Sequence, residues 1–268
     1  MKTQRVVSHE RKDGRPAGGV RAVERSLAIL SAFSPERSER SLEEISQLIE
    51  LPKSTTHRLL QTLSTSGFVE PGRKPGAYRL GLQAVAVGRI AAYDRRPEEG
   101  VSTVMRALRD HADEAVGLSV MEKSIVMVVA KEVSRHPLSY NLGVGAALPA
   151  YCTASGKVLL ADLPDSQIDR LYQGGRMSAQ TNRTIVTVET LKSHLQQVRH
   201  RGYAIDNEEL ADGLRCVAVP IRDFSGHVSH ALGVSGPSAR LSLDRLRELV
   251  EPLKAAARRI SVHMSMVA

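Results

Sequence analysis

Near the N-terminus, apolar residues recur at the three- and four-residue spacing of a helix that buries one face. The first such segment begins at Val20 and ends before Pro35, because proline cannot continue a helix. Its apolar positions are Val23, Leu27, Ile29, Leu30 and Phe33. The pattern predicts an amphipathic first helix.

A second and a third helix follow, separated by a short break. Ser41 begins the sequence S-L-E-E, a capping box in which Glu44 can reach back to the Ser41 amide. The break is residues 50–52, and the third helix runs from Lys53 to Leu63 before Gly67 stops it. The apolar positions of these two helices are Leu42, Ile45, Leu48, Ile49, Leu59, Leu60 and Leu63.

Two strand-like segments, residues 68–70 and 78–80, come next. The basic turn between them contains Pro71, Gly72, Pro75 and Gly76, which favours a hairpin. Three helices followed by a hairpin is the element order of a winged helix-turn-helix, a DNA-binding fold.

The chain divides into four parts on this pattern. We expect residues 1–18 to form a disordered basic tail, because they hold almost no large apolar residues. The winged helix-turn-helix occupies residues 19–81, and a linker helix follows over residues 82–96, with its periodic pattern ending before Pro97. Its apolar face could contact a second copy of the chain. A second domain occupies residues 97–265.

The second domain mixes helices with strands joined by tight turns. Helical spacing predicts helices over residues 98–112, 154–162, 165–173, 187–201 and 242–263. Strand-like runs occupy residues 115–121, 124–132, 203–206, 215–222 and 228–235. Hairpins among helices predict an α+β domain built on an antiparallel sheet.

Charge is denser in the N-terminal part. Residues 1–82 hold 14 Lys and Arg against 9 Asp and Glu, whereas the longer remainder holds 23 against 20. Such a segment is attracted to the phosphate backbone of nucleic acid. An acidic membrane surface would attract it too, so charge alone does not choose between these partners.

Composition narrows the class of protein further. No run approaches 18 consecutive apolar residues, and the first twenty residues lack the apolar core of a secretory signal. Cys152 and Cys216 lie far apart and form neither a disulfide framework nor a zinc motif. We therefore expect a cytoplasmic protein that holds no metal and no cofactor and has no membrane partner.

The third helix is the candidate for reading DNA, because the second helix of a helix-turn-helix enters the major groove. Arg58 suits guanine and Gln61 suits adenine, each through two hydrogen bonds. Lys53, Ser54 and Thr55 stand at the start of this helix, where a phosphate binds readily. The full candidate set is Arg21, Arg25, Lys53, Ser54, Thr55, His57, Arg58, Gln61, Arg73 and Lys74. The alternative interpretation is a small helical subdomain with solvated basic residues.

Long strings of the sequence closely resemble the IclR family of bacterial transcriptional regulators. They are LEEISQLIELPKSTTHRLLQTL over 42–63, GFV over 67–69, YRLG over 78–81, GYAIDNEE over 202–209, GLRCVAVP over 213–220 and ALGVSGP over 231–237. The resemblance covers nearly everything from Val20 onward. It implies a GAF-like effector domain, a homodimer or homotetramer bound to double-stranded operator DNA, and control by small organic acids or aromatic compounds.

The resemblance also implies an effector site between a helix-start segment, residues 148–157, and the last strands. The residues carried over are Leu148, Tyr151, Ala154, Ser155, Asp206, Cys216, Gly233 and Ser235. Gly233 stands where some relatives have a hydroxyl residue, which enlarges the site and disfavours an acid as small as glyoxylate. The P-A-Y-C-T sequence over 149–153 resembles regulators of aromatic-acid degradation.

Several of these residues have plainer interpretations. Tyr140 and Tyr151 could line an aromatic pocket or simply pack, and Cys216 could be buried filler. Lys157 could be solvated, or its charge could steer an acid toward the pocket. The chain holds no G-x-x-x-x-G-K-[ST], H-E-x-x-H or G-x-S-x-G motif, which argues against an enzyme. The remaining alternative is a DNA-binding oligomeric protein whose C-terminal domain binds no ligand.

Overall fold

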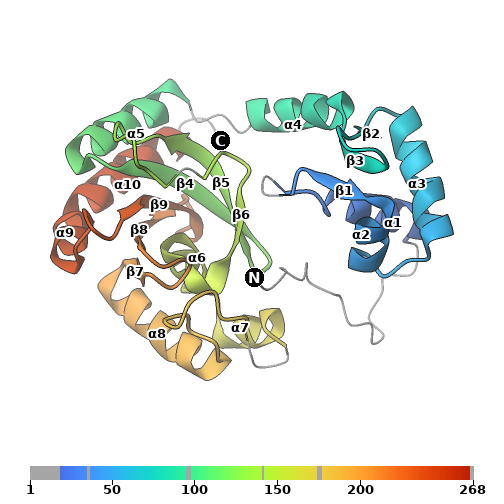
Figure 1. The fold of residues 1–268 in the computed structure, drawn as a ribbon. Helices are drawn as coiled ribbons and strands as arrows, with labels where there is room; N and C mark the ends of the chain where they lie inside the picture. Colours follow the sequence, from blue (N-terminus) through green and yellow to red (C-terminus); the bar gives the residue numbers. More distant parts are fainter. Residues whose placement is uncertain (1–18, 35–36, 95–97, 141, 174–176, 266–268) are drawn as a thin grey trace. The chain divides into compact units, whose positions relative to one another are not determined.

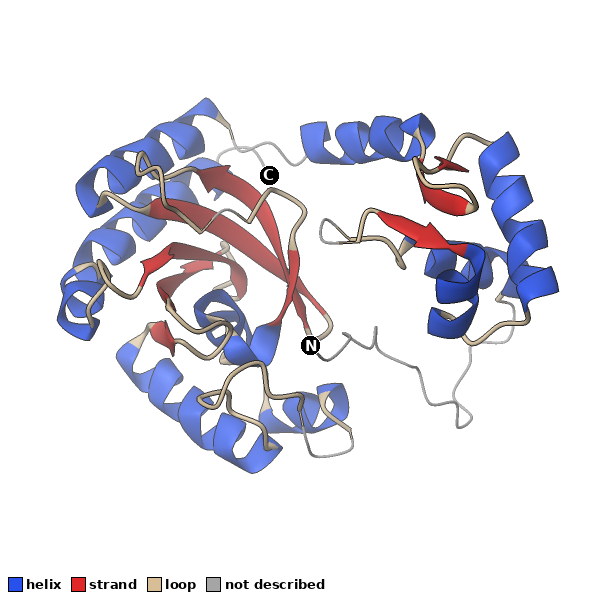
Figure 2. Cartoon of the chain, viewed as in Figure 1, coloured by secondary structure: helices blue, strands red, loops and turns tan. Residues whose placement is uncertain are grey.

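The computed structural model of the chain describes residues 19–34, 37–94, 98–140, 142–173 and 177–265. It divides after Asp94 into two compact units (Figures 1 and 2). The predicted disordered tail, residues 1–18, lies outside the described residues, as do residues 95–96 at the end of the predicted linker and Pro97.

The first unit is a winged helix-turn-helix, as predicted. Its helices are α1 (Arg21–Leu30), α2 (Leu42–Leu48), α3 (Lys53–Thr65) and α4 (Leu82–Asp94), and its strands are β1 (Glu39–Ser41), β2 (Val69–Pro71) and β3 (Ala77–Leu80). The strands form a sheet in the order β1-β3-β2. Strand β1 was not predicted, because the three polar residues E-R-S carry no apolar alternation.

Local signals account for most of this unit. The Ser41 hydroxyl accepts a hydrogen bond from the Glu44 amide at 3.2 Å, and the Glu44 carboxylate accepts one from the Ser41 amide at 2.8 Å. The capping box is therefore confirmed. Gly67 adopts a φ of 73°, the left-handed conformation expected just past the end of α3.

The predicted apolar side of α1 is partly wrong. Val23 and Leu27 are 55% and 57% exposed, whereas Ile29 is fully buried. Ile29 packs against Ile45 and the core residues of α3 and β2. The apolar residues of α1 form two overlapping stripes, and spacing alone could not show which stripe faces the core. The stripe that does not face it leaves apolar side chains at the surface of α1.

The second unit is built on a six-stranded antiparallel sheet in the order β6-β5-β4-β9-β8-β7; its strands are drawn in red in Figure 2. The strands are β4 (Ala115–Glu122), β5 (Ile125–Glu132), β6 (Ala147–Pro149), β7 (Ala204–Asn207), β8 (Leu214–Arg222) and β9 (Val228–Pro237). Strand β6 is three residues long and was not predicted.

Helices cover both faces of this sheet (Figure 1). One face packs against α5 (Glu99–Ala112), α9 (Leu243–Glu248) and α10 (Val250–Ser265). The other packs against the short 3-10 helix η1 (Ala150–Cys152), α6 (Ala154–Leu160), α7 (Asp165–Leu171) and α8 (Val188–Arg201). The predicted α+β class with an antiparallel sheet is confirmed.

Alternation along the central strands makes the two faces chemically different. Leu232 and Val234 of β9 join the core under α5 and α10, so Gly233 and Ser235 lie on the α6 side. Strand β4 repeats the pattern, with Leu118 in the same core and Gly117 and Ser119 on the opposite face. Small and polar residues therefore meet in the middle of the α6 face and leave room there.

The prediction of one helix over 242–263 is wrong, because α9 and α10 are separate helices that meet at Leu249. Pro252 lies in the first turn of α10 and has no amide hydrogen to continue the ladder from Glu248. The apolar period runs across the break, which explains why spacing alone suggested one helix.

Candidate functional site

The outward face of α3 carries the side chains that were predicted to reach base edges. Ser54, His57, Arg58 and Gln61 are exposed, and Thr55 is half-buried. The inward face consists of the buried residues Thr56, Leu60 and Leu63. Because positions three and four residues apart share a helix face, the exposed polar groups form one continuous surface.

The turn between α2 and α3 is closed by its own hydrogen bonds. The Ser46 hydroxyl donates to the Leu51 carbonyl at 2.6 Å, and the Leu51 amide donates to the Ser46 carbonyl at 3.1 Å. Glu50 adopts a left-handed φ of 53° within this turn. These contacts fix the direction in which α3 presents its exposed face.

The turn between β2 and β3, which is the wing of this fold, is basic. Arg73 and Lys74 are exposed at the β2–β3 turn, and the Glu39 carboxylate of β1 accepts a hydrogen bond from the Arg73 amide at 3.0 Å. That hydrogen bond lowers the pKa of Glu39. It fixes the turn while leaving the Arg73 guanidinium exposed, which suits a contact with a phosphate.

Two further basic positions differ in their surroundings. Arg21 is exposed on α1, and Arg25 is half-buried. The Lys53 ammonium lies 2.8 Å from the Glu43 carboxylate, and both side chains are more than half exposed. An ion pair this exposed contributes little, so Lys53 can exchange its partner for a phosphate.

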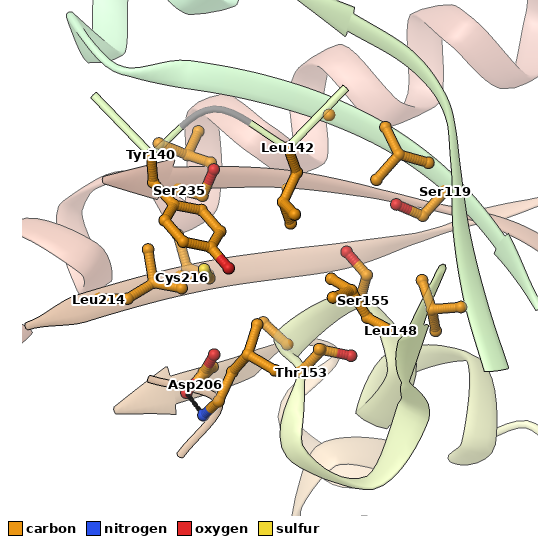
Figure 3. A pocket seen from close by; sticks show the side chains of 18 of the residues that line it. Ser119, Tyr140, Leu142, Leu148, Thr153, Ser155, Asp206, Leu214, Cys216 and Ser235 are labelled. Carbon is orange, nitrogen blue, oxygen red and sulfur yellow. Dashed lines mark hydrogen bonds between the residues drawn. The ribbon is translucent and has the colours of Figure 1, made fainter. Parts of the chain in front are cut away.

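A cavity opens on the α6 face of the sheet in the second unit (Figure 3). It leaves about 70 Å³ in which the centre of a water-sized molecule fits. A water needs about 10–15 Å³ of such space, so on the order of five waters fit. Because bonded atoms lie closer together than waters do, a molecule of more than five heavy atoms can enter.

The lining of the cavity combines apolar walls with a few polar groups, as small-molecule sites do. Figure 3 shows Asp206 and Thr153 on one side in this view and Ser119, Tyr140 and Leu142 on the other. Lys131 also lines the cavity, and its ammonium donates to the carbonyls of Tyr140 at 3.1 Å and Leu142 at 2.8 Å. Burial lowers the pKa of Lys131.

The structure brings most of the predicted effector residues to this one cavity. They are Leu148, Ala154, Ser155, Asp206, Cys216, Gly233 and Ser235. Tyr151 is the exception, since it is not part of the lining. Its hydroxyl donates to the Ser178 carbonyl at 2.6 Å, and its ring packs edge-on against Tyr172. Tyr151 is therefore a packing residue, whereas Tyr140 does line the cavity.

Sequence reasoning missed the side of the cavity formed by β4 and β5. Gly117 lies directly opposite Gly233 in the β4–β9 ladder, and Ser119 and Lys131 complete this side. The available signal was the interruption of the apolar run 115–121 by a glycine and a serine. At Gly233 a Cβ would lie 3.4 Å from the Ser155 hydroxyl oxygen, so the absent side chain does enlarge the cavity.

Asp206 is a fully buried carboxyl group in the cavity lining. Its Oδ1 accepts hydrogen bonds from the amides of Glu209 at 2.7 Å and Leu210 at 3.4 Å. Its Oδ2 has no hydrogen-bond partner among the described residues. Burial raises the pKa of Asp206 to about 7, against the opposing effect of Lys157.

Lys157 is not solvated, so that expectation is wrong; it is not part of the cavity lining, and steering of an acid by its charge stays a prediction. It is fully buried, donates to the Ile205 carbonyl at 2.6 Å and forms an ion pair with Glu209. This pair joins α6 to the end of β7. The neighbouring thiols are un-ionised, because burial raises the pKa of Cys152 to about 12 and that of Cys216 well above its usual value.

Two kinds of feature are absent from the described residues. None of the helices there is long and apolar enough to cross a membrane. Nor does that part of the chain gather three or more His, Cys, Asp or Glu side chains in a way that could hold a metal ion.

A winged helix-turn-helix followed by a domain with a small cavity is the arrangement of a transcriptional regulator with an effector domain. Residues 22–72 match the IclR helix-turn-helix domain, and residues 98–262 match the bacterial transcriptional regulator IclR C-terminal domain. The chain belongs to the IclR family of bacterial transcriptional regulators.

Individual relatives agree with this assignment. The HTH-type transcriptional regulator KdgR of Escherichia coli (strain K12) is 36% identical over 91% of this chain and 93% of its own length. The crystal structure of the C-terminal domain of E. coli KdgR is 37% identical, with a TM-score of 0.55 over 62% of this chain and 96% of that one.

A second relative shares the fold. It is an IclR homologue from Microbacterium hydrocarbonoxydans solved in complex with 4-hydroxybenzoate, 23% identical, with a TM-score of 0.71 over 90% of this chain and 98% of that one. The curated relatives are transcriptional regulators and not enzymes, which confirms the class inferred from the motifs.

Proposed function

We propose that this regulator works in the cytoplasm. It binds operator DNA through α3 and the wing, and it binds a small organic acid, preferably an aromatic one, in the cavity. The observation that carries the proposal is the lining, in which residues from all six strands of the sheet and the start of α6 surround one cavity with both apolar and polar groups. A domain that bound no ligand would be expected to fill this space with side chains.

Two features of the cavity support an acid with a ring. Lys131 supplies positive charge to the lining, and the first-turn amides of Ala154 and Ser155 have no acceptor within their helix. The facing glycines Gly117 and Gly233 leave flat backbone against which a planar ring can lie. The fold relative from Microbacterium binds such an acid.

On the DNA side, we assign base contacts to Arg58 and Gln61 and a supporting position on the same face to His57. Their exposure on one face of α3 supports this assignment. The phosphate contacts would come from Arg21, Arg25, Lys53, Ser54, Thr55, Arg73 and Lys74.

The effector proposal is tested by unfolding the protein in the presence of 4-hydroxybenzoate, benzoate, pyruvate and acetate. An acid at 100 times its dissociation constant should raise the free energy of unfolding by about 2.7 kcal/mol. Gly233→Val serves as control, because its side chain would occupy the space beside Ser155 and should abolish the shift. No shift with any of the acids, or an equal shift in the control, would favour the alternative of a domain without a ligand.

We further propose that the protein is a homodimer joined through α4. Leu82, Val85, Val87 and Ile90 of this helix are 79%, 55%, 47% and 65% exposed. Exposed apolar surface of this kind marks protein interfaces, and a regulator that grips two half-sites needs two copies of α3.

Ile90→Glu should convert the dimer to a monomer, because a charge cannot be buried unpaired in an apolar interface. Analytical ultracentrifugation measures this change and also distinguishes a dimer from a tetramer. Gln83→Glu adds the same charge at another exposed position of α4 and should leave the mass unchanged. A dimer that survives Ile90→Glu would place the interface elsewhere.

A further inference from the structure

Asp206 presents an unusual oxygen to the cavity. Its Oδ1 is held by two backbone amides, whereas its buried Oδ2 has no hydrogen-bond partner among the described residues. Because a buried carboxyl oxygen without a partner is costly, it points to a group that this pocket receives. Asp206 is part of the cavity lining, so its carboxyl group lies beside the space that an entering molecule would fill (Figure 3).

The charges around Asp206 do not balance when it is ionised. The charge of Lys157 in α6 lowers the pKa of Asp206, but this ammonium group is paired with Glu209, three residues after Asp206, and with the Ile205 carbonyl. An ionised Asp206 would therefore be a second buried carboxylate beside a single ammonium group.

The other titratable groups that face Asp206 change this balance little. Cys216 of β8, its cross-strand neighbour, and Cys152 of η1 are neutral thiols. Lys131 of β5 lines the cavity but donates to loop carbonyls.

An acid that enters the cavity as its anion adds another negative charge. Like charges in a buried site raise each other's pKa until one of them takes up a proton. A neutral carboxyl group has an O–H donor, and a hydrogen bond from O–H to a carboxylate is among the stronger ones in proteins. The oxygen of Asp206 that lacks a partner can carry that donor.

We propose that Asp206 binds the effector as a neutral carboxylic acid, with its Oδ2–H donating a hydrogen bond to the effector carboxylate. The proton comes from solvent and no covalent bond to the effector forms, so binding takes up a proton wherever Asp206 is ionised in the free protein. This inference rests on the proposed function, since it requires that the cavity bind an organic acid.

The linkage fixes the sign of the pH dependence. The pKa of Asp206 is about 7 in the free protein, and the bound anion raises it further. Below pH 7 the proton is already present, so affinity is highest and independent of pH. Above pH 7 each pH unit should weaken binding about tenfold, until the pKa of the liganded protein is reached.

The test is calorimetric titration of the full chain with benzoate, 4-hydroxybenzoate and pyruvate, each at pH 6.0 and at pH 8.5. Repeating the titration in phosphate and in Tris buffer measures proton uptake, because the two buffers release protons with different heats. We expect close to one proton per acid at pH 8.5 and almost none at pH 6.0. This measurement on the unaltered protein does not depend on the folding of any variant.

Asp206→Asn supplies the matched variant, because its amide replaces the O–H donor and cannot ionise. This variant should bind the acid with the same affinity at both pH values and without proton uptake. At pH 8.5 only about one molecule in 30 of the unaltered protein carries the proton on Asp206, so the variant should then bind about 30-fold more tightly. Asp244→Asn makes the same change at an exposed carboxylate of α9, outside the cavity, and should keep the proton uptake.

The outcomes separate the two proposals. Binding with no proton uptake and no pH dependence would overturn the role of Asp206 alone. If none of the three acids binds at either pH, the sensing of acids by this cavity fails, and the proton linkage fails with it.

Discussion

Replacing Arg58 with alanine should weaken operator binding by about 1–3 kcal/mol, roughly 5- to 150-fold, while leaving effector binding unchanged. Arg58 is exposed on the outward face of α3, so its loss should not disturb the core of the first unit. Its guanidinium can donate two parallel hydrogen bonds to guanine, which alanine cannot replace. The operator is obtained by selecting bound duplexes from a random library, and affinity is measured by fluorescence anisotropy at fixed salt.

Two further variants show what kind of contact is lost. Arg58→Lys keeps the charge but loses the fork of donors, so it should lose selectivity for the operator and keep affinity for random DNA. Arg259→Ala removes an exposed arginine from the second unit and should change neither. Unchanged operator affinity in Arg58→Ala would mean that α3 meets DNA through a different face.

Replacing Lys157 with methionine should lower the free energy of unfolding by about 3–5 kcal/mol, because it leaves the buried Glu209 carboxylate without its cation. Urea denaturation measures this loss. Adding Glu209→Gln should restore much of it, since the double variant holds no unpaired buried charge at these two positions.

An exposed ion pair provides the comparison. Lys254 and Glu251 lie 3.0 Å apart, and Glu251 is 74% exposed. Lys254→Met should therefore cost about 0–1 kcal/mol. If Lys157→Met cost no more than this, the ion pair with Glu209 would not be a buried one.

The sequence predicted the first unit well because its signals are local. The capping box at Ser41, the break at Pro52 and the stop at Gly67 each act within a few residues. The second unit is less accessible to such reasoning. The facing of Gly117 and Gly233 depends on the register of β4 against β9, two strands more than a hundred residues apart in the chain.

Lys157 shows the same limit for a single side chain. A lysine in a helical segment is normally solvated, and its burial here depends on Glu209, 52 positions away. The effector residues on β6, η1, α6 and β7 to β9 came from the family resemblance, and the cavity unites them apart from Tyr151 of η1. Tyr151 packs against Tyr172 and not against the cavity. It lies on η1, a single helical turn that is too short to show an apolar period, so the sequence could not indicate this orientation.

The buried pair of Lys157 and Glu209 has a consequence for how the effector domain can evolve. Replacing either partner alone leaves an unpaired buried charge. Each such single variant would therefore be less stable than the protein it arose from. Gly233 and Ser235 carry no such constraint from an ion pair. Ligand preference can therefore diverge rapidly through substitutions at Gly233 and Ser235. Lys157 and Glu209, by contrast, should be inherited or replaced together.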